Sequence, residues 1–180
     1  DIYTGGVVAY LNSGKIENVY NLADIEGLNY TGGIVGWANS GTIQNSYNAG
    51  DITSRNAYAG GIAGRIVGTT AAKVYMSNTY NNGEILAASS AGGLVGYVDG
   101  TSTNKFSVIS DSYSSGLVSA NTGAGGILGY YVASANTRTN VYYDMSVISQ
   151  YDQPKTLKPE FVTDPHGLKT DGLVFSTGII

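Results

Sequence analysis

Adjacent glycine pairs recur along the chain at nearly constant spacing. The first glycines of five pairs are separated by 27, 28, 32 and 33 residues, and each pair leads into a short apolar run such as IVGW or LVGY. The pairs are Gly5-Gly6, Gly32-Gly33, Gly60-Gly61, Gly92-Gly93 and Gly125-Gly126. Self-similarity with a period of about 20 to 50 residues is typical of solenoids, propellers and repeat arrays, in which each unit buries its apolar face by stacking on the next.

A polar residue two positions before a tyrosine is the second landmark of the repeat. Its copies are Asn18/Tyr20, Asn45/Tyr47, Asn78/Tyr80, Asp111/Tyr113 and Asn140/Tyr142. From each tyrosine to the next glycine pair the separation is 12 or 13 residues, whereas from the second glycine to the tyrosine it varies from 14 to 20. Insertions are therefore expected at one edge of the repeat, directly after the apolar run.

The residues of the repeat favour strands and turns over helices. Glycine occurs every few positions, and β-branched and aromatic residues form short runs between Asn/Ser/Gly clusters. In one repeat we expect three short strands, at residues 32–37, 41–47 and 50–53 (GGIVGW, GTIQNSY and GDIT). The sequence thus predicts an all-β fold, a parallel β-solenoid of about five coils over residues 1–148. Residues 149–180, which hold all three prolines, are expected to form an irregular C-terminal cap or a linker.

Stacked coils place equivalent residues about 4.8 Å apart along the axis, so like side chains form rows. The expected inner rows are Val7/Ile34/Ile62/Leu94/Ile127, Ile16/Ile43 and Ile25/Ile52/Ile85/Val118. The repeat tyrosines should form a ladder of stacked rings, and the Asn/Asp row a ladder of hydrogen-bonded amides. The glycine pairs fit a coil corner, where a second backbone approaches closely and φ above zero is accepted.

Composition excludes several classes of function. Charged residues make up only 12% of the chain, the net charge is −4, and no Lys/Arg cluster occurs, so no nucleic-acid partner is expected. Cysteine is absent and His166 is the only histidine, which excludes thiolate metal sites, His-based triads and two-histidine zinc sites. No apolar run is long enough to span a membrane, and we expect a mature or excised soluble piece.

The segments GGIVGW…GTIQNSYNAGDI and GGLVGY…DSYSSGLV resemble the bacterial GLUG-motif repeat over roughly residues 4–148. The resemblance implies a region of a large secreted or cell-wall-attached bacterial protein. Such repeats occur in adhesin-like proteins and in the stalks of immunoglobulin A metallopeptidases, where they are non-catalytic spacers. It therefore implies an extracellular location and flanking domains of the same parent chain as partners.

One row of carboxylates is a candidate site. Asp24, Asp51 and Glu84 each lie four residues after a repeat tyrosine, so stacking would bring like charges within about 5 Å. The row could hold a cation, with Ca²⁺ the most plausible ion, or supply an acid/base pair. The favoured interpretation is a solvent-facing edge with screened carboxylates. No other cofactor is expected.

The insertions after the apolar runs form a second candidate site. Residues 66–76, 98–108 and 131–139 would project from the same corner of three consecutive coils. Cationic and aromatic residues there suit contact with a host glycan or protein. They are Arg65, Lys73, Tyr75, Lys105, Phe106, Tyr131 and Arg138. Drift in loop length without a function would give the same pattern.

The sequence favours a non-enzymatic extracellular module of a larger bacterial surface protein, acting as a rigid spacer or an adhesive segment. The first alternative is a glycan- or protein-binding adhesin domain that uses the inserted loops. The second is a polysaccharide-degrading β-helix enzyme that uses Asp51 and its neighbours in the acidic row.

Overall fold

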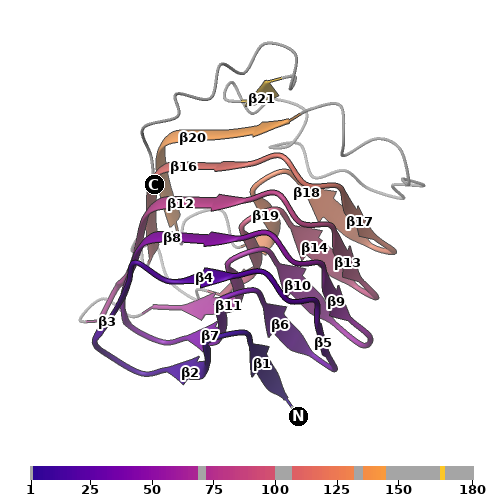
Figure 1. Cartoon of the computed structure of the whole chain (residues 1–180), viewed down its shortest axis with the longest axis horizontal. Coiled ribbons are helices and arrows are strands. Elements are labelled where there is room, and N and C mark those ends of the chain that lie inside the picture. The colour runs from indigo at the N-terminus through magenta and orange to yellow at the C-terminus, as the bar shows by residue number, and fades with distance from the viewer. Residues whose placement is uncertain (1, 69–71, 100–106, 132–135, 145–166, 169–180) are drawn as a thin grey trace.

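The computed structural model describes residues 2–68, 72–99, 107–131, 136–144 and 167–168. Within these residues the chain winds as a β-solenoid in which every strand pair is parallel. Figure 1 shows the coils stacked on one another along the chain, with the N-terminus at one end of the stack. The described residues contain no helix, and hence none that could cross a membrane. The predicted fold class is confirmed.

Four parallel sheets, named A to D here, run along the stack. Sheet A comprises β1 (Tyr3–Gly5), β6 (Tyr30–Gly32), β10 (Tyr58–Gly60), β14 (Ser90–Gly92) and β18 (Gly123–Gly125). Sheet B comprises β2 (Val8–Leu11), β7 (Val35–Ala38), β11 (Ala63–Val67), β15 (Val95–Asp99) and β19 (Leu128–Tyr131). Sheet C comprises β3 (Lys15–Glu17) and β4 (Tyr20–Asn21), both paired with β8 (Gly41–Asn48), then β12 (Val74–Asn81), β16 (Ser107–Ser114), β20 (Asn136–Asp144) and β21 (Gly167–Leu168). Sheet D comprises β5 (Ile25–Gly27), β9 (Ile52–Ser54), β13 (Ile85–Ala87) and β17 (Val118–Ala120).

A coil therefore has four strands where the sequence predicts three. The expected strand at residues 32–37 is divided at its glycine pair, so that β6 ends at Gly32 and β7 begins at Val35. The extra strand, β6, carries the short Tyr-Thr-Gly segment, of which the prediction places only Gly32 in a strand. It is a strand because the neighbouring coils supply its hydrogen bonds, in the register Tyr30↔Tyr3 and Tyr30↔Tyr58.

Equivalent residues of successive coils are vertical neighbours, as predicted. Tyr47 pairs with Tyr80, and Ile52 pairs with Ile85. The inner rows are buried as expected except at the first coil, where Val7 is 44% exposed although its row mate Ile34 is fully buried. Val7 is exposed because β2 has a neighbouring strand on one side only, namely β7.

The interior is divided into two apolar compartments. The first lies between sheets B and C and is filled by large side chains such as Ile66, Met76 and Leu94. The second lies between sheets D and A, and its members include the small residues Ala59 and Ala91. Apolar burial of this kind stabilises by roughly 25 cal/mol per Å² removed from water, and it is continuous along the stack in both compartments.

A row of buried asparagines separates the compartments and explains the glycine pairs. Asn48 is fully buried, receives a hydrogen bond from Asn21 and donates one to Asn81, with Nδ2–Oδ1 distances of 2.7 Å for both. A Cβ on Gly61 would lie 2.3 Å from Cγ of Asn81 and 2.3 Å from the carbonyl oxygen of Gly93. At Gly6, Gly33 and Gly61 glycine is thus required because an asparagine and a backbone both press against it, whereas Ser114 takes the place of the asparagine at Gly93 and Tyr143 takes it at Gly126.

The glycine pairs do not need φ above zero, contrary to one part of the prediction. Among the described glycines, positive φ is confined to Gly14 and Gly41. The close backbone approach is confirmed, since a Cβ on Gly60 would lie 2.2 Å from the carbonyl oxygen of Ala63. Glycine is therefore required at these positions because a Cβ would clash, and not because of the backbone conformation.

The residues with positive φ are instead the repeat Asn and Asp residues. Asn18, Asn45, Asn78, Asp111 and Asn140 have φ between 49° and 57°. Asn and Asp are the side chains that tolerate this left-handed region best. Asn18 lies between β3 and β4, and the other four lie within strands of sheet C. The expected amide ladder is present where Nδ2 of Asn78 donates to Oδ1 of Asn45 at 3.1 Å and Nδ2 of Asn140 donates to Oδ1 of Asp111 at 3.0 Å.

Each residue of the repeated Asn-Ser-Tyr motif now has a structural role. After the bend at Asn45, the Ser46 hydroxyl turns inward, donates to the carbonyl of Gln44 at 2.7 Å and accepts from the amide of Val19 at 3.3 Å. Tyr47 points outward and stacks between two row mates. The ring centroids of this row lie 5.3, 4.7 and 5.1 Å apart for Tyr20–Tyr47, Tyr47–Tyr80 and Tyr80–Tyr113, with interplanar angles of 13°, 2° and 3°.

The expected cap or linker at residues 149–180 lies outside the described residues except at β21. There Gly167 and Leu168 pair in parallel with Tyr143 and Asp144 of β20.

Candidate functional site

A cluster of aromatic side chains lies on the outer faces of sheets A and B, where the two sheets meet. Sheet A contributes a row of tyrosines, and sheet B contributes a row of aromatic residues interrupted by one arginine. We name this group the A/B aromatic cluster; it comprises Tyr3, Tyr30, Tyr58, Tyr10, Trp37, Arg65, Tyr97, Asp99 and Tyr130.

The corner between sheets A and B is re-entrant. Outward side chains diverge at a convex corner, but here rings from the two sheets touch. The centroids of Tyr58 and Tyr97 are 4.7 Å apart, and those of Tyr3 and Trp37 are 4.6 Å apart. Because the glycine pair at the corner is pressed against the asparagine row, the outer surface folds inward and brings the two aromatic rows together.

Arg65 of β11 is the charged centre of this cluster. Its guanidinium lies 4.3 Å from the Trp37 ring centroid and 5.0 Å from that of Tyr30, and its side chain is only 17% exposed. Nη2 forms an ion pair of 2.5 Å with Oδ2 of Asp99 in the next coil. Cation–π contact is worth about 0.5 to 2 kcal/mol, more where water is excluded, so this cation is held in place and neutralised.

Burial affects the acidity of the tyrosines in this cluster. Burial raises the pKa of Tyr58 above its usual value, with a smaller contribution from the charge of Tyr30. Burial also raises the pKa of Tyr97, with Asp99 adding to the effect. Both side chains therefore remain neutral hydroxyls at physiological pH and can donate as well as accept hydrogen bonds.

The accessible part of the cluster lies at its two ends. The inner rings cover one another because they stack along the axis, whereas Tyr10 and Tyr130 are 45% and 38% exposed. Two buried donors, Nε1 of Trp37 and Nε of Arg65, have no hydrogen-bond partner among the described residues. Chemically, the cluster offers aromatic surface and hydroxyls without net charge.

The inserted edges are only partly within the described residues. Lys105 and Phe106 lie outside them. Lys73 and Tyr75 are exposed at the start of strand β12 in sheet C. Arg65 points instead into the A/B aromatic cluster. The structure therefore does not bring Arg65 to the outer face of sheet C, where Tyr75 lies.

Tyr131 and Arg138 form a pair of their own at the C-terminal end of the described stack. The Arg138 guanidinium lies 5.5 Å from the centroid of the Tyr131 ring. Tyr131 pairs with the buried Val98 of the previous coil, and Arg138 pairs with the buried Ile109. Tyr131 also packs against the core between sheets B and C. Their positions are thus continuations of core rows.

The acidic row is stacked as predicted, but its carboxylates have other partners. Oδ1 of Asp24 accepts from the backbone amide of Asp51 at 2.9 Å, and Oδ1 of Asp51 accepts from the amide of Glu84 at 2.8 Å. Within the described part of the chain no group of three or more His, Cys, Asp or Glu side chains is close enough to hold a metal ion. Of the proposed ligands Asp24, Asp51 and Glu84, the first two therefore join successive coils through their carboxylates.

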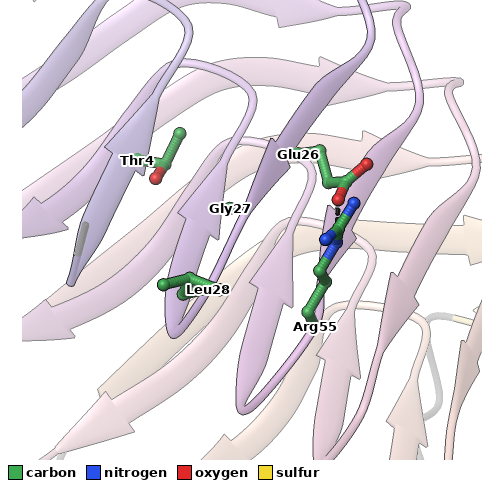
Figure 2. Close-up of a pocket in the computed structure, with 5 residues that line it drawn as sticks. All are labelled: Thr4, Glu26, Gly27, Leu28 and Arg55. Carbon is green, nitrogen blue, oxygen red and sulfur yellow. Dashed lines mark ion pairs between the residues drawn. The ribbon is translucent and has the colours of Figure 1, made fainter.

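A pocket of about 320 Å³ opens at the junction of sheets D and A in the first two coils. Figure 2 shows Thr4 and Leu28 on one side of it and the ion pair of Glu26 and Arg55 on the other, with Gly27 between them. Both charged side chains are at least half exposed. Such exposed ion pairs contribute about 1 kcal/mol or less. The pocket therefore has mixed polar and apolar walls and no buried charge.

Sequence inspection missed most of the A/B aromatic cluster. The signal is present, because its members keep a fixed offset from the glycine pairs. Tyr30 and Tyr58 lie two residues before the first glycine of a pair, and Trp37 and Tyr97 lie five residues after it. What the offsets do not reveal is that the corner between these positions is re-entrant.

Comparison with known proteins gives one informative similarity. The chain is similar to a solved structure described as a "putative immunoglobulin A1 protease" from Bacteroides ovatus, with 28% sequence identity and a TM-score of 0.60. The similarity covers 79% of this chain and 46% of that one, so the chain spans less than half the length of the protein it matches. No family model and no curated protein matches the chain.

Proposed function

We propose that this chain is a non-catalytic, extracellular spacer module of a larger secreted or surface-attached bacterial protein. The observation that carries the proposal is the unbroken register of the stack: buried asparagines, stacked tyrosines and apolar rows connect every neighbouring pair of the first three coils. A stack whose units are joined by so many kinds of contact transmits position along its axis with little bending.

Three further observations support this function. The likeness to less than half of a longer bacterial protein is what a module of a larger chain would show. The Gly-Gly and Asn-Ser-Tyr elements both have scaffold roles, which is consistent with a GLUG-motif repeat region. In the acidic row, on which the enzyme alternative rests, the carboxylates of Asp24 and Asp51 accept hydrogen bonds from backbone amides.

The spacer function predicts a rigid axial distance. Glu17 and Thr139 belong to one row that runs through Gln44, Ser77 and Ser110. Four steps of about 4.8 Å place their Cα atoms roughly 19 Å apart. The chain has no native cysteine. A double variant with Glu17→Cys and Thr139→Cys would therefore carry spin labels at these two positions only, and pulsed electron paramagnetic resonance would measure the distance between them.

A narrow distribution about this distance is the expected result, and a broad one would refute a rigid spacer. The non-catalytic part is tested by incubating the chain with immunoglobulin A1 and with a polysaccharide panel. Turnover that disappears in Asp51→Asn would refute it.

Adhesion through the A/B aromatic cluster is the second candidate function. The exposure of Tyr10 and Tyr130 at its two ends favours this candidate. Glycan-array binding that is lost in Tyr10→Ala with Tyr130→Ala would assign adhesion to this cluster. Loss in Tyr75→Ala with Arg138→Ala would assign it to the inserted edge instead.

A further inference from the structure

The first coil carries most of the exposed apolar side chains of the described residues. Of nine large hydrophobic residues that are exposed, six belong to residues 2–28. They are Ile2, Val7, Tyr10, Tyr20, Leu22 and Leu28. Soluble proteins rarely concentrate apolar surface in this way unless it is an interaction site.

Val7 and Tyr20 are exposed because of their position in the stack. Val7 belongs to the row of Ile34, which is fully buried, and Tyr20 is 60% exposed although its row mate Tyr47 is half-buried between two rings. The pattern of side chains on the first coil is therefore that of an internal coil. Only its neighbour on one side is missing.

The backbone of the first coil shows the same asymmetry. Each of its strands β1 to β5 pairs with one strand of the second coil and with no other among the described strands. In the next coil, Tyr47 donates its amide to Val19 and Ala49 donates its amide to Asn21. The corresponding amides of Tyr20 and Leu22 point to the open side, where an edge strand is a template for pairing.

Two polar features of this face match a further coil. Asn48 accepts a hydrogen bond from Asn21 through Oδ1. Oδ1 of Asn21, which accepts from the amide of Ala23 at 3.2 Å, occupies the equivalent place at the open end of the ladder. The amide of Asp51 donates to the carboxylate of Asp24 in the coil before it. The amide of Asp24 is the equivalent donor of the first coil, and a carboxylate of a preceding coil would be its acceptor. A coil with an asparagine and an acidic residue at these positions would complete both rows.

The pocket of Figure 2 lies on the same face. Thr4 and Gly27, which line it, begin rows that continue in the fully buried Ala59 and the buried Ala87 of later coils. The hydroxyl oxygen of Thr31, fully buried behind Gly27, has no hydrogen-bond partner among the described residues. The pocket is thus the unfilled end of the D–A compartment.

We propose that this face, formed by the first coil, docks one more coil of the same repeat pattern, supplied by the larger protein of which the chain is a module. The interface would continue the one that already joins the first and second coils, with a tyrosine over Tyr20, an amide on Asn21 and an apolar residue over Val7. This inference rests on the proposed function, because it needs a larger parent protein.

The test extends the chain by one coil. A copy of residues 28–54 joined directly before Asp1 keeps the 27-residue period of the first two coils. Hydrogen exchange of the Tyr20 and Leu22 amides, followed by NMR, is expected to slow at least about tenfold because they become bonded within the stack. The matched control carries the same extension with the copies of Gly33 and Asn48 replaced by leucine, and in it exchange stays fast.

Two results would overturn the proposal. One is exchange at Tyr20 and Leu22 that is equally fast with either extension. The other is slow exchange already present in the unextended chain together with a dimer in sedimentation equilibrium, which would assign the face to a second copy. Neither outcome changes the spin-label distance between residues 17 and 139, so failure here is distinguishable from failure of the spacer function.

Discussion

Replacing Asn48 by alanine tests whether the buried asparagine row holds the two halves of each coil together. The Asn48 side chain takes part in three hydrogen bonds of 2.7 Å, from Asn21 Nδ2, to Asn81 Oδ1 and to the carbonyl of Gly50. All three are buried, and water cannot replace them without entering the narrowest part of the interior.

The expected loss of stability follows from these bonds. Each buried hydrogen bond contributes about 0.5 to 1.5 kcal/mol net, and acceptors left buried without a partner add a desolvation penalty. Asn48→Ala leaves Oδ1 of Asn81 and the Gly50 carbonyl without the donor that Asn48 provides, and we expect the free energy of unfolding to fall by about 3 to 5 kcal/mol. Asn39→Ala is the matched control, because Asn39 makes one exposed hydrogen bond to Asn12 and should cost about 1 kcal/mol or less.

Urea unfolding followed by circular dichroism and by Trp37 fluorescence measures both values, from the midpoint and the slope of the transition. Trp37 is the only tryptophan of the chain, so its signal is unambiguous. If Asn48→Ala and Asn39→Ala unfold at the same urea concentration, the row does not contribute to stability and the argument for it fails.

Three more predictions concern the glycines and the tyrosines. Gly61→Ala should lower the free energy of unfolding by at least about 3 kcal/mol because its Cβ would overlap a backbone and a side chain. A Cβ on Gly14 meets nothing within 4 Å, so Gly14→Ala should cost only about 1 kcal/mol, for its φ of 96°. Equal losses in urea unfolding would contradict this. Tyr47→Ala removes two ring stacks and Tyr20→Ala only one, so the near-ultraviolet dichroism and the stability should fall more in the first, by about 1 kcal/mol. Burial, and to a smaller extent the charge of Tyr80, raises the pKa of Tyr113 from 10 to about 12. The contribution of Tyr113 to stability is therefore complete below pH 10 and is lost as the pH rises toward 12. A tyrosinate absorbance titration in which every tyrosine of the folded protein ionises near pH 10 would refute this.

Much of the scaffold can be derived from the sequence because its period is explicit. The spacing of the glycine pairs gives the register, and the register alone predicts that Ile52 lies on Ile85 and Tyr47 on Tyr80. These predictions succeed because they need only the assumption that equivalent residues are vertical neighbours. They do not depend on how each coil is folded in cross-section.

The cross-section itself is what the sequence leaves undetermined. The segment Tyr30–Gly32 is too short to be recognised as a strand, although tyrosine and threonine both favour strands. The left-handed conformation of Asn45 is equally hidden, since an asparagine two residues before a tyrosine is compatible with a regular extended strand as well. Both features depend on contacts between coils, which local propensity does not contain.

The candidate sites differ in predictability for the same reason. The acidic row is found from spacing, but the bonds from Asp24 and Asp51 to backbone amides of the next coil are not, because they depend on side-chain orientation. The A/B aromatic cluster requires knowing that the corner turns inward, and Arg65 therefore falls in a different environment from the one that its place beside an insertion suggests.

The asparagine row also explains why insertions are confined to one edge of the repeat. From the repeat tyrosine to the next glycine pair, the chain encloses the D–A compartment, whose narrow width is set by Ala59, Ala91 and the asparagine row. An extra residue there would shift a glycine off its asparagine and place a Cβ into backbone. The connection from sheet B to sheet C leaves from the opposite end of the coil, beyond the B–C compartment. Where it is described in the first two coils it is bonded at the surface, as in the exposed hydrogen bond from Asn39 to Asn12. Variation in length is therefore tolerated at that connection and excluded between the tyrosine and the glycines.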